Sequence, residues 1–410
     1  MPLAPSPRAT RTTSFPPPLR LAVVETAPFG GLLHYAVQLA DALAGEGHDV
    51  DLVLPAGHEL AGRAGAARRL EVLPEGLGQP AASPGRLAVL RRRVRTAGYR
   101  LQCWRRIIAT VRRGRYDAVV LNGSFDLTLS VHAARLLMRV CPATVVAHVC
   151  HNVRPFNRWG GEDLFLRNPR LEAALRRLYP AFNVVFVHGE RSRGEFEELW
   201  PGTRLAVIPH GDERVFGEEP PPPSPEPRAL FFGDWRRVKG LDVLLDAFDA
   251  VSAELPGALL TIAGSPSPEE GGAEAVLAWA AERPGRVEVQ PRYVPLEEVR
   301  ELFGQARVVV LPYRVGYQSG VLHLAMTMGR AVVVTDVGDL SGAVEDGRTG
   351  LVVPPADPEA LAEAIVRVLA DPELAGRLGV AGRAHLLAGS DWATVAAEAG
   401  RALRTAVGRR

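Results

Sequence analysis

Short runs of apolar residues alternate with longer stretches of helical periodicity along most of the chain. The first half has runs that are almost continuously apolar, at 19–24, 50–55, 117–122, 144–149, 184–188 and 205–209. Such runs are typical of parallel strands that helices cover on both faces. The pattern therefore predicts an α/β architecture from residue 19 onwards.

A proline-rich segment separates this half from a second half with the same pattern. Residues 218–227 read EEPPPPSPEP, which favours neither a helix interior nor a central strand. Beyond it, strands are expected at 229–232, 258–264, 287–290, 308–312, 331–336 and 350–353. Helices are expected at 240–255, 296–304, 357–370 and 391–407. Two such halves predict two doubly wound, Rossmann-like domains that face each other across a cleft.

The length of the chain agrees with two domains. At 410 residues it exceeds what one hydrophobic core usually supports. We expect domains at 19–217 and 228–390, joined by the linker at 218–227. Residues 1–18 are rich in Pro, Ser and Thr, and we expect a disordered tail there.

Composition narrows the class of protein. A net charge of +2 and an aromatic content of 6% argue against nucleic-acid binding, which needs a basic surface or a stacking platform. Three unpatterned cysteines indicate a reducing compartment. No apolar run approaches the ~18 residues that span a bilayer, and no secretory h-region precedes Phe15. We expect a cytoplasmic protein.

Position 239 holds the only lysine among the 48 lysines and arginines. It follows the strand at 229–232 and a glycine, just before the helix expected at 240–255. A helix start after a strand attracts phosphate oxygens, and a compact ammonium suits a diphosphate that changes charge. Lys239 is thus a candidate catalytic and diphosphate-binding residue. The alternative is that compositional drift left one lysine by chance.

A second phosphate-like turn follows the strand at 308–312. Gln318, Ser319, Gly320 and Val321 open a helix that ends at Gly329. Free amides at 319–322 beside a residue without a side chain are suited to a diphosphate. The sequence therefore predicts donor contacts at Gly316, Gln318, Ser319, Gly320, Val321 and Leu322. Ordinary capping of the helix by Ser319 is the alternative.

The first half offers two weaker candidates. Gly30 and Gly31 precede a helix that starts near Leu32, which fits either a ligand loop or a plain turn. His151 comes just after the carboxyl end of the strand at 144–149. Ligands of open α/β sheets bind beyond such ends. A metal site with His148 and Cys150 is disfavoured, since no fourth ligand is evident. A purely structural His151 stays open.

Five segments in order carry a resemblance to a known family. They are HNVRP, VHGERSRGEF…VIPHGDERVF, FFGDWRRVKGLDVLLDAF, LPYRVGYQSGVLHLAMTMGRAVVVTDVG and VEDGRTGLVVPPADPEALAEAI. Together they resemble glycosyltransferase family four, whose members are retaining, metal-independent enzymes of the GT-B fold. The likeness runs from about Leu19 to the end and is densest between Asn183 and Ala370.

The resemblance implies transfer of a hexose from a nucleoside-diphosphate sugar to a glycan or lipid-linked acceptor, with no cofactor. It matches Lys239 to the lysine on the donor diphosphate, and Gly30 and Gly31 to a loop touching donor phosphate and sugar. It matches His151 to the histidine beside the transferred sugar. It also implies that the helix at 391–408 crosses back onto the first domain.

The chain departs from the family pattern at three positions. Asp234 stands where the family has arginine, so Arg236 or Arg237 is expected to supply the missing cation. Gly316 and Leu324 stand where many relatives carry two glutamates, the second of which holds the ribose. These departures keep two alternatives open: a catalytically degenerate nucleotide-sugar-binding scaffold, and a nucleotide-sugar epimerase of the same fold.

The segment 86–115 contains eleven arginines and no acids. Its apolar residues recur at steps of three and four, which predicts one amphipathic helix or two shorter ones around Gly98. The stripe comprises Leu87, Leu90, Val94, Ala97, Leu101, Trp104, Ile108 and Val111. Burial of this stripe against the sheet is slightly favoured over peripheral adhesion to an anionic membrane.

Overall fold

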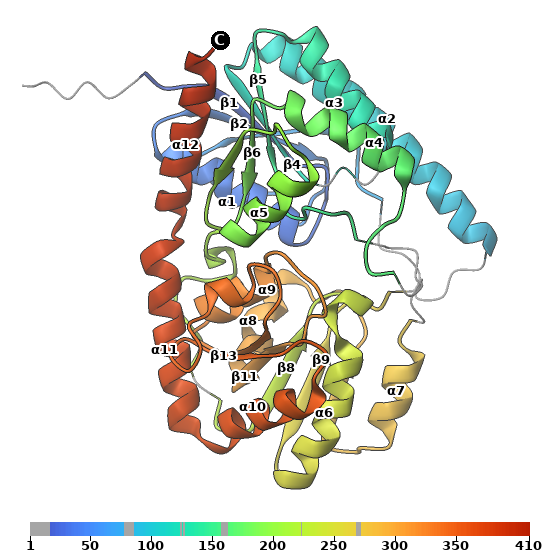
Figure 1. Cartoon of the computed structure of the whole chain (residues 1–410), viewed down its shortest axis with the longest axis vertical. Helices are drawn as coiled ribbons and strands as arrows, with labels where there is room; N and C mark the ends of the chain where they lie inside the picture. Colours follow the sequence, from blue (N-terminus) through green and yellow to red (C-terminus); the bar gives the residue numbers. More distant parts are fainter. Residues whose placement is uncertain are drawn as a thin grey trace, which may run out of the picture.

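Two parallel sheets, one in each lobe of the molecule, organise the chain (Figure 1). The computed structural model describes residues 17–77, 86–123, 125, 128–156, 163–222, 224–267 and 272–410. The first sheet has the order β3-β2-β1-β4-β5-β6-β7, and the second has β10-β9-β8-β11-β12-β13. The two-domain, doubly wound α/β fold predicted from the apolar runs is confirmed. The tail expected at 1–18 lies, up to residue 16, outside the described residues.

The first lobe contains these elements in chain order. Its strands are β1 (Arg20–Val24), β2 (Asp49–Pro55), β3 (Arg68–Leu73), β4 (Ala118–Asn122), β5 (Val145–Val149), β6 (Val184–Val187) and β7 (Leu205–Val207). Its helices are α1 (Gly31–Gly45), α2 (Arg86–Gly114), α3 (Thr128–Val140), α4 (Pro169–Leu178) and α5 (Glu190–Leu199).

The second lobe repeats the alternation. Its strands are β8 (Arg228–Phe232), β9 (Leu259–Ala263), β10 (Val287–Gln290), β11 (Val308–Leu311), β12 (Ala331–Thr335) and β13 (Leu351–Val353). Its helices are α6 (Leu241–Glu254), α7 (Glu274–Ala281), α8 (Leu296–Gln305), α9 (Gly320–Thr327), α10 (Pro358–Ala370) and α11 (Pro372–Gly389). Helix α12 (Trp392–Gly408) ends the chain.

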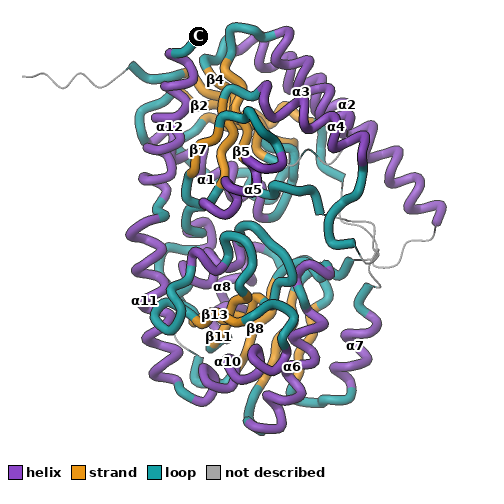
Figure 2. Tube along the Cα trace, viewed as in Figure 1, coloured by secondary structure: helices purple, strands orange, loops and turns teal. Residues whose placement is uncertain are grey.

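Helices cover the sheets on both faces (Figure 2), which explains the nearly continuous apolar strands. Every residue of β4 and β5 is buried. Neighbouring side chains on a strand point to opposite faces, so Val23 packs with α1 and α12, whereas Val24 packs with the cluster that includes residues of α2, α3 and α4. The apolar alternation of the sequence thus builds two core layers in one lobe.

Each sheet changes winding direction at one pair of strands. In the first sheet the change lies between β1 and β4, and in the second between β8 and β11. Ligands of open α/β sheets bind beyond the carboxyl ends of the strands at such points. In this chain α1 follows β1, the Lys239 turn follows β8, and α9 follows β11. The topology therefore places all three candidate loops at the two switch points.

The last helix belongs to the first lobe by its contacts. Helices α11 and α12 run along one side of both lobes (Figure 1), and α12 packs against α1. Trp392, Val395 and Leu403 join the core layer under α1, and the indole N–H of Trp392 donates to Asp212 O at 2.8 Å. The C-terminal helix therefore crosses back onto the first domain.

Two expectations fail for physical reasons. Strand β3 was not predicted, because it is a half-polar edge strand without an apolar run. Segment 86–114 forms a single helix, so the two-helix alternative is wrong. Its stripe is not buried as one surface either: Trp104 is 7% exposed, but Leu101 is 49% and Val94 67% exposed. The first half of α2 extends past the body of the domain (Figure 1).

Candidate active site

A cavity of about 1280 Å³ lies between the lobes and is lined by both of them. The first domain contributes the start of α1, the middle of α2, the end of β5 and the segment around Phe156. The second domain contributes the turn after β8, the loops after β9 and β10, and the loop that leads into α9. The two predicted phosphate-like turns therefore open into one cavity.

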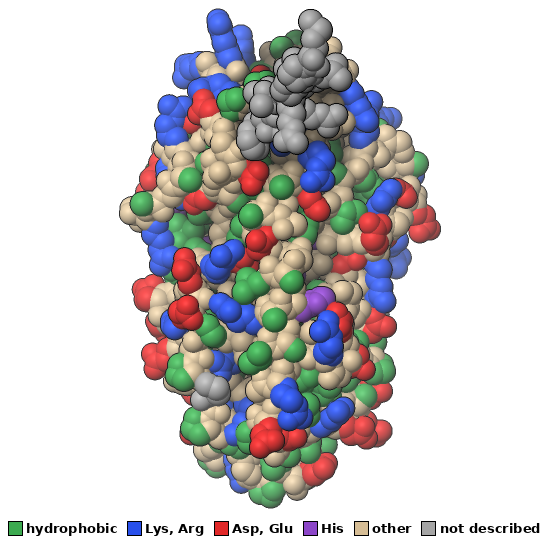
Figure 3. All heavy atoms as spheres, turned by 90° about the vertical axis from the view of Figure 1, so that its left-hand side faces the viewer, with side chains coloured by type: hydrophobic (Ala, Val, Ile, Leu, Met, Phe, Trp, Pro, Cys, Tyr) green, Lys and Arg blue, Asp and Glu red, His purple; other side chains and the backbone are tan. Residues whose placement is uncertain are grey.

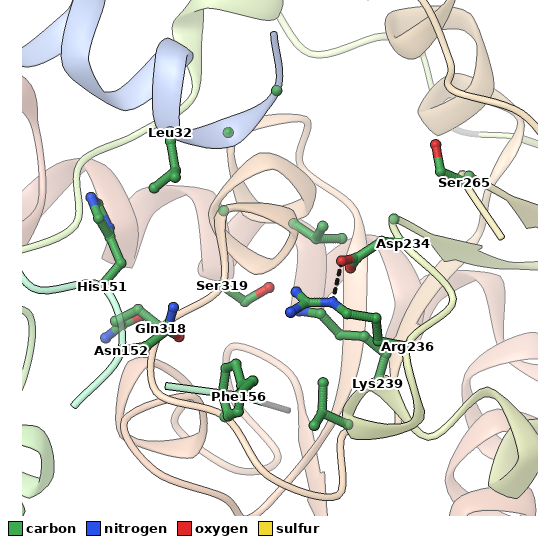
Figure 4. A pocket seen from close by; sticks show the side chains of 18 of the residues that line it. Leu32, His151, Asn152, Phe156, Asp234, Arg236, Lys239, Ser265, Gln318 and Ser319 are labelled. Carbon is green, nitrogen blue, oxygen red and sulfur yellow. Dashed lines mark hydrogen bonds and ion pairs between the residues drawn. The ribbon is translucent and has the colours of Figure 1, made fainter. Parts of the chain in front are cut away.

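The Lys239 turn is a 3-10 turn, Arg237–Lys239, that ends at Gly240 with φ of 64°. A Cβ at Gly240 would lie 1.9 Å from Pro312 O, so the turn requires glycine on both counts. The ammonium of Lys239 sits 3.8 Å from the centroid of the Tyr313 ring. The negative face of the ring attracts the ammonium and so restrains its position. Lys239 lines the cavity and lies beside Arg236 (Figure 4).

The α9 turn is tied directly to the Lys239 turn. The Tyr313 hydroxyl lies 2.9 Å from Ser319 Oγ, and Arg314 N donates to Val238 O at 2.9 Å. Ser319 Oγ in turn accepts from Leu322 N at 3.4 Å and caps α9. Tyr313 therefore bridges the ammonium to the helix N-terminus, and it was not among the predicted site residues. Its place at the end of β11 was the available signal.

This capping changes the predicted set of amides. Gly316, Gln318, Ser319, Gly320 and Val321 all line the cavity. The sixth predicted residue, Leu322, is fully buried, lies off the cavity, and has its amide bonded to Ser319. The structure thus does not bring Leu322 to the site. The open end of α9 is formed by the amides of Gly320 and Val321, which come before Leu322.

The expected replacement cations behave differently from each other. Arg236 lines the cavity, forms an ion pair with Asp234, and stacks 5.9 Å over the Phe156 ring. Figure 4 shows this pair beside Lys239. Arg237 is exposed and does not line the cavity. Because Asp234 balances the charge of Arg236, Lys239 is the cation whose charge the turn presents to a ligand.

The glycine loop of the first domain lies on the opposite wall. Gly30 has φ of 84°, and both Gly30 and Gly31 line the cavity. The amide of Gly30 donates to Glu59 Oε1 at 2.5 Å, so it is already engaged by the protein. Gly31 and Leu32 follow it in the first turn of α1 and line the cavity, and the amides of a first turn have no partner within the helix. Nothing in the sequence around Glu59 signalled this contact.

His151 lines the cavity at the end of β5, but both its ring nitrogens meet protein partners. Nε2 donates to Asn122 Oδ1 at 2.8 Å, and Nδ1 lies 3.4 Å from His188 Nε2. Burial, with His188 and His148 nearby, lowers the pKa of His151 well below its ordinary value. The ring is therefore neutral, and it turns its nitrogens away from Lys239 (Figure 4). His148 packs separately, against Phe125 and Phe182.

Two buried carboxyls support this wall. Glu25 accepts from Asn122 Nδ2 and from the amides of Thr26 and Ala27, and burial raises its pKa to about 7. Glu213 lines the cavity, accepts from Gln38 Nε2 at 3.2 Å, and has its pKa raised to about 8 by burial. Within the described residues, no group of three or more His, Cys, Asp or Glu side chains is arranged to hold a metal.

Comparison with known proteins agrees with this geometry. Residues 29–212 match Glycosyltransferase Family 4, and residues 226–371 match Glycosyl transferases group 1. The alpha-maltose-1-phosphate synthase of Mycolicibacterium smegmatis is 31% identical over 309 residues, which cover 68% of this chain and 76% of that protein. The chain belongs to glycosyltransferase family 4. It is a glycosyltransferase of the GT-B fold.

A shorter match and two solved structures extend the comparison. The alpha-D-kanosaminyltransferase of Streptomyces kanamyceticus is 39% identical over 82 residues, 20% of this chain and 21% of that enzyme. Sucrose-phosphate synthase from Thermosynechococcus elongatus superposes with a TM-score of 0.73 at 22% identity, covering 95% and 99% of the two chains. Anabaena HepE, solved with UDP-glucose, gives 0.68 at 14%, covering 94% and 100%. Both structures share the fold.

Proposed function

We propose that this family 4 glycosyltransferase moves a hexose from a nucleoside-diphosphate sugar to a saccharide or lipid-linked acceptor, with retention and without a metal ion. One observation carries the donor assignment: Lys239 and the open end of α9 are joined through Tyr313 on one wall of the cavity. An ammonium and a set of aligned amides are what a diphosphate leaving group requires.

The chemistry follows from the charge that develops. As the glycosidic bond breaks, the departing diphosphate gains negative charge, and groups already oriented around it stabilise that state without reorganising. Lys239, on a turn fixed by Gly240, and the amides of Gly320 and Val321 hold this role. Among the described residues that line the cavity, the carboxyl groups are those of Glu213 and Asp234, and Asp234 is ion-paired with Arg236. We therefore assign proton acceptance to the leaving phosphate, in place of the pair of carboxylates that a glycosidase uses.

The first domain supplies the sugar and acceptor walls. His151 is neutral and engaged by Asn122 and His188, so it shapes the wall beside the sugar and does not act as a base. The acceptor side is bounded by Thr96, Ala97 and Arg100 of α2. The acceptor hydroxyl then approaches the donor from this side of the cavity.

The test is donor-dependent release of nucleoside diphosphate. HepE was solved with UDP and with UDP-glucose, and a relative from Mycolicibacterium smegmatis is named for GDP-mannose, so a thermal-shift screen starts with uridine and guanosine diphosphates and their sugars. Donors that raise the melting temperature are followed by turnover with added acceptors. EDTA is expected to leave the rate unchanged.

Two outcomes separate this proposal from its rivals. Binding without turnover, with any acceptor class, supports the degenerate scaffold, for which Asp234, Gly316 and Leu324 are the motive. Release of free nucleotide that no acceptor accelerates supports an epimerase. A transferase releases nucleoside diphosphate faster when its acceptor is added.

We also infer that the exposed half of α2 contacts an anionic membrane surface. Val94 and Leu101 are exposed there, among arginines and with no acid between residues 86 and 115. By contrast, the face with α11 and α12 carries acidic and basic side chains side by side (Figure 3). A basic surface with exposed aliphatic side chains suits anionic lipid, and the same helix borders the acceptor side of the cavity.

Vesicle flotation tests this contact. The protein is expected to float with vesicles that contain phosphatidylglycerol and to stay behind with phosphatidylcholine alone. Val94→Asp and Leu101→Asp should abolish flotation, whereas Val380→Asp, at a site 73% exposed on α11, should not. Equal behaviour on both lipids would end the membrane assignment. No helix in the described part of the chain combines the length and apolar content that crossing a bilayer requires.

A further inference from the structure

Glu59 connects the two domains beside the cavity. It lies in the loop after β2, and its backbone amide donates to Pro28 O at 2.9 Å. The side chain is 16% exposed and does not line the cavity. It therefore stands behind the cavity wall, with its position fixed by the loop that precedes α1.

Two groups at the start of α1 donate to one oxygen of this carboxylate. Gly30 N lies 2.5 Å and His34 Nε2 lies 2.6 Å from Oε1. Gly30 is the N-cap of α1 and has no side chain with which to accept a hydrogen bond. A negative charge at a helix N-terminus is favourable, so Glu59 supplies the capping anion that the helix lacks.

The other oxygen faces the second domain. The hydroxyl of Tyr293, in the loop between β10 and α8, donates to Glu59 Oε2 at 2.5 Å. The ring of Phe29 meets the ring of Tyr293 edge-on, with centroids 5.4 Å apart. Burial raises the pKa of Glu59, but the hydrogen bonds from His34 and Tyr293 outweigh burial and hold that pKa below its ordinary value. The carboxylate is charged at neutral pH.

We propose that Glu59 and Tyr293 form an interdomain clasp that fixes the loop at 29–32 when the domains are close together. The bond joins residues of two different domains, so a movement of the domains away from each other would break it. It uses the amide of Gly30, which leaves the amides of Gly31 and Leu32 to meet the donor. Glu59 is thus a positioning residue for transfer, and this role rests on the proposed function.

The kinetic test removes one hydroxyl. Tyr293→Phe leaves the contacts of Glu59 with Gly30 and His34 intact and deletes only the bond from Tyr293 to Glu59. Other bonds between the domains, such as that of Arg191 with Asp336, remain. We expect the KM for the donor found in the screen to rise about tenfold, as loss of a charge-assisted hydrogen bond produces, with kcat within about twofold. Tyr116→Phe is the matched control, since its hydroxyl donates to a carboxylate, Asp51, at the same 2.5 Å but within the first domain.

A second measurement is independent of any donor. Small-angle scattering of the unliganded full chain should give a larger radius of gyration for Tyr293→Phe and Glu59→Ala than for the wild type and Tyr116→Phe. Glu59→Gln, which keeps an acceptor for Gly30, should fall between wild type and Glu59→Ala. An unchanged radius of gyration in Tyr293→Phe overturns the clasp, whatever the kinetics. If no nucleotide sugar is turned over, the proposed function fails, and scattering still decides the clasp.

Discussion

Two helix N-termini line the cavity, and they are completed in different ways. Helix α9 is capped from within: Ser319 precedes it and accepts from Leu322 N. Helix α1 begins after Gly30, which has no side chain, and takes its anion from Glu59 in another loop. Both follow a strand at a switch point of their sheet. One terminus is therefore encoded locally, and the other depends on tertiary contacts.

The difference bears on what each terminus can do. With its cap in place, α9 keeps the amides of Gly320 and Val321 for a ligand, next to the ammonium of Lys239. The amide of Gly30, at the start of α1, donates a hydrogen bond to Glu59. Glu59 also accepts a hydrogen bond from Tyr293 of the other domain. The charge and the amides on the α9 side are therefore held within one domain. The loop at the start of α1 is instead held by a contact that depends on the position of the second domain.

The largest predicted effect concerns the α9 side of the cavity. Lys239→Ala should lower kcat/KM more than a thousandfold, on the order of 4 kcal/mol of transition-state stabilisation, because the ammonium offsets the charge of the leaving diphosphate. Lys239→Arg keeps the charge but not the compact shape, and should recover part of the rate. Turnover near the wild-type level in Lys239→Ala would remove the ammonium from the mechanism.

This asymmetry also explains what the sequence could predict. The strands and the two turns of the second domain depend on local patterns, so the fold and the region around Lys239 and Ser319 were within reach. Glu59 and Tyr293 are 234 residues apart, and no local pattern joins them. The exposure of Val94 also escaped, because helical periodicity defines a stripe but does not say how far the domain beneath it extends.

Glu59, which caps α1 from another loop, should contribute more to stability than an exposed carboxylate on the same helix. Glu59→Ala should lower the free energy of unfolding by about 3 kcal/mol, because three partly buried donors lose their acceptor at once. Glu46, exposed at the other end of α1, is the control: Glu46→Ala should change stability by less than ~0.5 kcal/mol. Thermal melts of both variants measure the difference. Equal melting temperatures would mean that water replaces the carboxylate without cost.

Glu213 allows a test of the region where the two walls meet. It accepts from Gln38 of α1, and its other oxygen would lie 3.4 Å from a Cβ at Gly320 of α9. Burial, and then the nearby charge of Asp212, raise its pKa to about 8. Because the folded pKa lies above the ordinary 4.5, this residue contributes stability at low pH that is lost as pH rises towards 8.

The expected size follows from the same linkage. Between about pH 5.5 and 7.5 the free energy of unfolding of the wild type should fall by about 2 kcal/mol relative to that of Glu213→Gln, whose side chain stays neutral throughout. Melting temperatures of both proteins across that range measure it. If the melting temperatures of the two proteins change with pH in parallel, Glu213 is ionised in the folded protein, and the region between α1 and α9 contains a buried negative charge.

The smallest predicted effect is that of removing Ser319, the N-cap of α9. Ser319→Ala removes the acceptor for Leu322 N and should cost about 1 kcal/mol of stability, like the loss of other N-caps. Asp391→Ala, which removes the cap of α12 far from the Lys239 turn, should cost the same. Donor KM should change less than about threefold in Ser319→Ala, because the amides of Gly320 and Val321 remain. A larger rise in the donor KM would mean that the Ser319 hydroxyl itself binds the donor. The capping group of α9 would then, like that of α1, have a second role besides capping its helix.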